Sequence, residues 1–146
     1  MKKFSFTLQS WYDMQLGLEK QHKLELKKCE AELIKRRHDL ETLNKAFDRA
    51  KHDYCSVVTR GVLATRIKDY GHFFDSNKLA MAVVQSDIAR LEREKEQCMQ
   101  KLIHTRRELK LLDKLREKQY KEYLMDTKKQ HDKFVDDLVS FNATVL

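Results

Sequence analysis

The sequence predicts an all-α fold, a long antiparallel two-helix coiled-coil hairpin, and three observations carry this prediction. The 146 residues include no proline and only three glycines, so little interrupts helix formation. Charged residues make up 36% and apolar residues 41%, which suits a narrow apolar seam between solvated faces better than a globular core. Apolar residues also recur at alternating spacings of three and four, the 3.5-residue period of a coiled coil.

A first helix is predicted over about residues 4–57, from the positions that the alternating spacing marks as its seam. The marks shift once, by a four-residue stutter after His22. They fall on Phe4, Leu8, Trp11, Gln15, Leu18, His22, Leu26, Cys29, Leu33, Arg36, Leu40, Leu43, Phe47, Ala50, Tyr54 and Val57.

A chain reversal is predicted over about residues 58–66, where β-branched and small residues replace the charged-helix pattern. Gly61 can take a positive φ there. Folding about residue 62 gives a register that pairs Leu40 with Val84, Leu33 with Leu91, Leu26 with Cys98 and Phe4 with Tyr120.

A second helix is predicted over about residues 67–141, and the whole chain, 1–146, is predicted to be a single coiled-coil domain. The helix should extend past its partner beyond residue 120, with a weaker apolar stripe of Phe134, Leu138 and Phe141. Its seam marks fall on Tyr70, Phe74, Asn77, Met81, Val84, Ile88, Leu91, Lys95, Cys98, Leu102, Thr105, Leu109, Leu112, Arg116, Gln119 and Tyr123.

Several seam positions are polar, and two interpretations of them stay open. Polar seam residues penalise wrong registers, which we favour over a functional polar site. These residues are Gln15, His22, Arg36, Asn77, Lys95 and Arg116.

Composition and motifs argue against several functional classes. The net charge of +7 is spread over both halves with acidic residues nearby, so it predicts solvated faces and no nucleic-acid partner. No segment reaches the roughly 20 apolar residues of a membrane span, and we expect no membrane insertion. A two-helix fold offers no enclosed catalytic cleft, so we expect no enzyme. The scattered histidines predict no metal site and no cofactor, and the three cysteines read as reduced cytosolic thiols.

Aromatic residues gather at both predicted ends of the hairpin. Near the turn, Phe73 lies off the seam marks, and packing within the turn end and docking of a partner remain equal alternatives. At the other end we favour mutual packing over docking for Phe6, Trp11, Tyr12, Leu112, Leu115, Tyr120 and Tyr123.

Four short segments stand out in order along the chain: Phe4-x-Phe6-x-Leu8-Gln9, Tyr70-Gly71-His72-Phe73, the run from Leu112 to Gln119, and Asp136-Asp137. In this order they resemble the FliJ family, the small coiled-coil component of the bacterial flagellar type III export apparatus. The resemblance extends over nearly the whole chain. It implies a non-catalytic protein at the cytoplasmic face of the cell membrane that serves motility and chemotaxis.

The resemblance also implies partners: the export ATPase FliI, the export gate protein FlhA, and export chaperones. The end that carries both chain termini would bind the ATPase ring as a central stalk, through Phe4, Phe6, Leu8, Trp11, Leu112, Leu115 and Tyr120. The turn end would bind the gate, through Phe47, Ala50, Tyr54, Phe73, Asn77, Ala80 and Val84. Gly71, Asn77 and Val84 depart from the residue types expected in the family.

Two alternatives to this function are a stalk protein of a related type III secretion system or rotary ATPase, and a basic coiled-coil nucleic-acid binder. Genomic neighbourhood would separate the first. For the second, affinity would fall steeply with salt.

Overall fold

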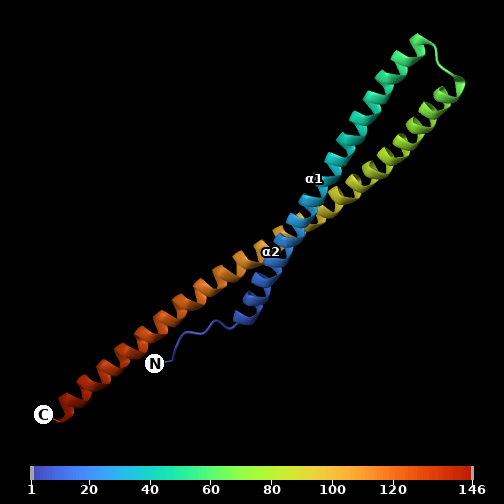
Figure 1. The fold of residues 1–146 in the computed structure, drawn as a ribbon. Coiled ribbons are helices and arrows are strands. Elements are labelled where there is room, and N and C mark those ends of the chain that lie inside the picture. Colours follow the sequence, from blue (N-terminus) through green and yellow to red (C-terminus); the bar gives the residue numbers. More distant parts are fainter. Residues whose placement is uncertain (1, 146) are drawn as a thin grey trace. The chain divides into compact units, whose positions relative to one another are not determined.

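The structure is a computed structural model that describes residues 2–145, and these form two long α-helices packed against each other. Helix α1 spans Gln9–Arg60 and helix α2 spans Ala64–Val145, with no strand among the described residues (Figure 1). The predicted all-α helical hairpin is confirmed.

The helix boundaries differ from the expected ones at both ends and at the turn. Helix α1 begins at Gln9, five residues after the expected start, because Phe4, Phe6 and Leu8 alternate with polar residues and precede the helix in non-helical chain. The backbone N–H of Gln9 donates to the Phe6 carbonyl at 3.2 Å. Helix α2 continues to Val145, past the expected end at residue 141.

The connection between the helices contains only residues 61–63, so it is shorter than the expected turn of 58–66. Gly61 has a φ of 81°, the left-handed conformation that commonly ends a helix. Its N–H donates to the Val58 carbonyl at 3.3 Å. Arg60 places a positive charge in the last turn of α1, which complements the helix dipole.

Contacts within the chain group into two compact units. The hairpin unit is His22–Lys101, and the terminal unit combines Met1–Gln21 with Leu102–Leu146. The single coiled-coil domain expected from the sequence stays a prediction.

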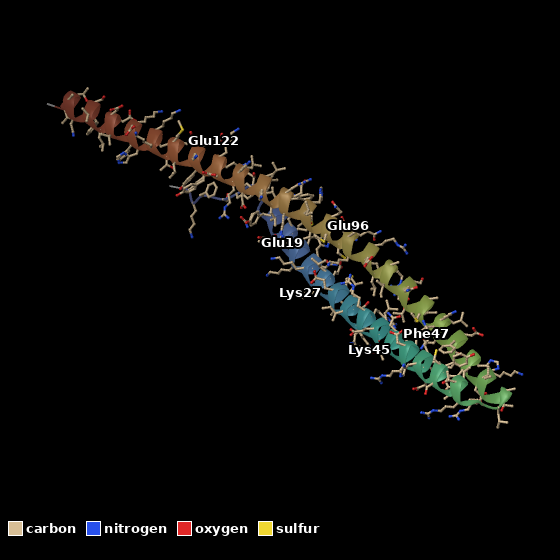
Figure 2. The ribbon with its side chains drawn as sticks, turned by 90° about the horizontal axis from the view of Figure 1, so that it is seen from above. Glu19, Lys27, Lys45, Phe47, Glu96 and Glu122 are labelled. Carbon is tan, nitrogen blue, oxygen red and sulfur yellow. The ribbon has the colours of Figure 1, made fainter. Side chains whose placement is uncertain are left out.

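The hairpin unit is held together by the predicted seam. Leu33 and Leu91 are the most buried side chains, at 2% and 1% exposure, and every marked seam residue in this unit is buried or half-buried. Phe47 on α1 contacts Phe74 on α2 with ring centroids 5.1 Å apart. Figure 2 shows Phe47 on the side of α1 that faces α2 and Lys45 on the other side. These pairs agree with folding about residue 62.

Polar seam residues of the hairpin unit join the two helices. The Asn77 side-chain amide donates to the Leu43 carbonyl at 3.4 Å. Arg36 lies 3.5 Å from the Asp87 carboxylate, and Lys95 lies 3.9 Å from Glu30 across the helices. These cross-helix partners fit this register, which supports our interpretation of the polar residues.

The terminal unit packs the non-helical segment before α1 against α2. Phe6 is buried, and Phe4 contacts Tyr120 with ring centroids 5.1 Å apart, which is the pairing that the register predicted. Thr7 and Gln119 exchange side-chain hydrogen bonds at 3.1–3.3 Å. Because this segment is not helical, the seam mark on Leu8 is wrong. Trp11 lies in the first turn of α1, and its seam mark is also wrong because its side chain is exposed.

The last part of α2 carries the predicted apolar stripe without a packing partner among the described residues. All described side chains from residue 128 onward are exposed, including Phe134, Leu138 and Phe141. Neither helix, over the described residues 2–145, contains a stretch long and apolar enough to cross a membrane.

Candidate functional site

The strongest candidate site is an aromatic cluster in the hairpin unit, near the connection between the helices. Tyr54 from α1 meets Tyr70 at 5.5 Å and Phe74 at 6.0 Å between ring centroids, both edge to face. Phe73 contacts Phe74 at 6.0 Å but keeps 42% of its surface exposed. Edge-to-face packing stabilises such rings in fixed orientations, so the cluster holds Phe73 at the surface on a rigid support.

A groove of about 530 Å³ lies beside this cluster. Its walls come from both helices and combine an aromatic surface with two arginines and two aspartates. The lining residues are Ala46, Arg49, Ala50, Asp53, Arg66, Asp69, Tyr70 and Phe73. An open apolar groove with charges of both signs at its edges suits an amphipathic segment of another protein.

The seven residues predicted to bind the export gate fall into two groups in the structure, those at the groove and those packed between the helices. Ala50 and Phe73 line the groove, while Phe47 and Tyr54 are half-buried in the aromatic cluster that supports it. Asn77 and Val84 are buried at 6% and 7% exposure between the helices, and Ala80 is half-buried. Of the seven residues, Phe73 and Ala50 are therefore the ones that a partner bound in the groove would contact.

The charged groove residues Arg49, Asp53, Arg66 and Asp69 were missed from the sequence. The 3.5-residue period marks only the positions that face the opposite helix, whereas these residues flank the seam. A signal was present, because Ala46, Arg49, Ala50 and Asp53 have the same spacing as Arg66, Asp69, Tyr70 and Phe73. Residues spaced three and four apart share one helix face.

A second candidate surface lies in the terminal unit. Phe4, Asp113, Arg116, Glu117 and Tyr120 line a groove of about 330 Å³. The Tyr123 hydroxyl donates to the Lys2 carbonyl at 2.7 Å, which fixes the start of the chain beside this groove.

Tyr12 and Asp113 join α1 to α2 in the same unit. A side-chain hydrogen bond to Asp113, together with burial, raises the pKa of Tyr12 above its usual value. The interaction favours the neutral phenol because the phenol can donate to the carboxylate and the phenolate cannot.

The residues predicted to bind the ATPase also fall into two groups, buried and exposed. Phe6 and Leu112 are buried at 7% and 6% exposure, and Leu115 is half-buried. Leu8, Trp11 and Tyr120 are exposed at 40–46%, and Phe4 lines the groove. Only the last four offer apolar surface to a partner, and the first three form the packing beneath them.

Neither surface shows a metal centre. Within residues 2–145, no group of three or more histidine, cysteine, aspartate or glutamate side chains is placed to hold a metal ion. What both surfaces offer is recognition chemistry: exposed aromatic rings beside charged groups.

The comparison with known families agrees with the resemblance described above. A family model described as "Flagellar FliJ protein" matches residues 4–144. No curated protein and no solved structure matches the chain.

Proposed function

Because the chain belongs to the FliJ family, a family of flagellar export components, we propose that it is a non-catalytic stalk and escort of the export apparatus. In this role it binds the export ATPase FliI, links it to the gate protein FlhA, and accompanies export chaperones. Its place is the cytoplasmic face of the cell membrane, where it acts as a peripheral protein. The observation that carries the proposal is the family match over almost the whole chain.

The groove beside Phe73 is the surface that we assign to FlhA. Phe73 is a large aromatic residue that stays 42% exposed although its neighbours are packed. Aromatic anchors of this kind dominate the energy of many protein interfaces. The arginines and aspartates of the groove would select a complementary pattern of charge on the gate.

The exposed aromatic residues of the terminal unit are the surface that we assign to FliI. Trp11 and Tyr120 are each about half exposed, and Leu8 adds to the apolar surface. As a stalk, the pair of helices would contact a ring of ATPase subunits. It can change the balance between the ring's conformations only if its contacts differ from one conformation to the next.

The test is a pull-down of the full chain with FliI and FlhA from the same organism. Phe73→Ala and Tyr54→Ala should weaken only FlhA binding, by tenfold or more for Phe73 if it is a binding hot spot, about 1.4 kcal/mol or above. Trp11→Ala should weaken only FliI binding.

Matched controls come from exposed apolar residues outside the two surfaces. Leu79→Ala, at 71% exposure on α2, controls for Phe73, and Met14→Ala, at 48% on α1, controls for Trp11. If the wild-type chain binds neither partner and leaves FliI turnover unchanged, the proposed function is wrong. If the control variants lose binding as much as the test variants, the assignment of surfaces is wrong while the function stands.

A further inference from the structure

Two of the three cysteines meet across the helices of the hairpin unit. Cys29 on α1 and Cys98 on α2 are both half-buried seam residues, and both line one groove of about 290 Å³. The register expected from the sequence placed Leu26, one turn from Cys29, near Cys98. In the structure, the two cysteines border the groove from opposite helices.

The packing around the two cysteines keeps them opposite each other. Glu30 and Lys95 form a cross-helix ion pair at 3.9 Å beside them. The most buried leucines of the chain, Leu33 and Leu91, lie one and two turns away. A disulfide needs Cβ atoms about 3.5–4.5 Å apart, and two seam residues that line one groove from opposite helices are placed for such a bond, so we expect oxidation without separation of the helices.

We propose that Cys29 and Cys98 form a reversible disulfide that locks the hairpin unit when the chain meets a disulfide oxidant such as glutathione disulfide. One cysteine thiolate attacks the oxidant, forms a mixed disulfide and releases one glutathione thiolate. The second cysteine thiolate attacks the protein sulfur of the mixed disulfide and releases the other. Two cysteine thiols are oxidised, one glutathione disulfide is reduced to two glutathione molecules, and the cysteine protons end on these products.

The surroundings of Cys29 slow its own reaction with an oxidant. Burial raises the pKa of the Cys29 thiol, and interactions with Cys98, Glu94 and Glu32 raise it further. Less of this cysteine is therefore thiolate at neutral pH, and attack by Cys29 on the oxidant is slowed. The second attack is intramolecular, so a mixed disulfide at either position closes quickly.

The third cysteine provides the matched control. Cys55 is exposed on α1, away from this groove, so Cys55→Ser removes a competing thiol and leaves the pair intact. Full-length Cys55→Ser protein is incubated with glutathione disulfide under native conditions, digested with trypsin without reductant, and analysed by mass spectrometry. A cross-linked species of peptides 29–35 and 96–101 is expected, and it should be absent from Cys29→Ser/Cys55→Ser and from Cys98→Ser/Cys55→Ser.

A second measurement reports on the lock itself. The disulfide closes a loop of about 70 residues, so the oxidised Cys55→Ser protein should melt higher by about 5 °C or more, and reductant should reverse the shift. Circular dichroism of each variant confirms that it is helical before oxidation. If native Cys55→Ser protein gives only single glutathione adducts or dimers, or if the cross-link forms without raising the melting temperature, the proposal is overturned.

Discussion

Leu91→Ala tests the packing on which the whole register depends. Leu91 is 1% exposed and belongs to the same buried part of the seam as Leu33. Leucine-to-alanine changes in buried positions cost about 2–5 kcal/mol, from lost transfer free energy and the cavity that remains. Here we expect about 3 kcal/mol, because half-buried Asp87 and Lys95 lie one turn away and a seam between two helices can partly close.

The assay is urea unfolding of the full chain followed by helical circular dichroism. With a slope of about 1.5 kcal/mol per molar urea, the midpoint should fall by about 2 M. Leu79→Ala is the control, because Leu79 is 71% exposed on the same helix and its loss should cost under about 0.5 kcal/mol. Leu91→Met preserves volume and should cost less than about 1.5 kcal/mol.

The reasoning would be refuted by similar shifts for Leu91→Ala and Leu79→Ala. Equal shifts would mean that Leu91 does not face α1, and the register about residue 62 would be wrong. A large loss for Leu91→Met as well as for Leu91→Ala would instead indicate a site that tolerates no change of shape.

The remaining predictions concern two glycines and one tyrosine. Gly61→Ala should destabilise the chain by about 1 kcal/mol in urea unfolding, since its φ of 81° is strained for any residue with a Cβ; an unchanged midpoint would argue against this conformation. Gly71→Ala should stabilise by about 0.5–1 kcal/mol, because Gly71 lies within α2 and a Cβ there meets nothing within 4 Å; a loss of stability would show a contact at this position. The raised pKa of Tyr12 means that its contribution to stability is present below pH 10 and is lost as pH rises through the folded-state pKa. Asp113→Asn should lower that pKa, measured as the phenolate absorbance that Tyr12→Phe removes, and an unchanged titration would contradict the role of Asp113.

The seam of the hairpin unit was predictable because a period of 3.5 residues leaves little choice of buried face. The same marks, folded about residue 62, matched Phe4 with Tyr120 in the terminal unit. Cys98 was expected near Leu26, and it also shares a groove with Cys29, which lies one turn further along α1. Periodicity alone cannot separate two such neighbours, because residues one turn apart lie on the same helix face.

Two features were not predictable from the seam period: the non-helical segment before α1 and the groove beside Phe73. Phe4 and Phe6 alternate as in an extended segment, yet the apolar spacing of three and four also fits Phe4, Leu8 and Trp11. The groove beside Phe73 depends on residues that flank the seam, and their shared face becomes meaningful only when the two helices are placed together. Which proteins occupy these surfaces stays a prediction.

The three-residue connection between α1 and α2 limits how the hairpin unit can move. The chain from Arg60 to Ala64 makes four Cα–Cα steps and can span roughly 14 Å when extended, while packed helices lie about 8–10 Å apart. Sliding one helix along the other by two heptads would need an axial displacement of about 21 Å, which is more than the connection can span. A force applied along one helix is therefore passed to the other as tension through Gly61, and the unit responds by moving both helices together or by unwinding their ends.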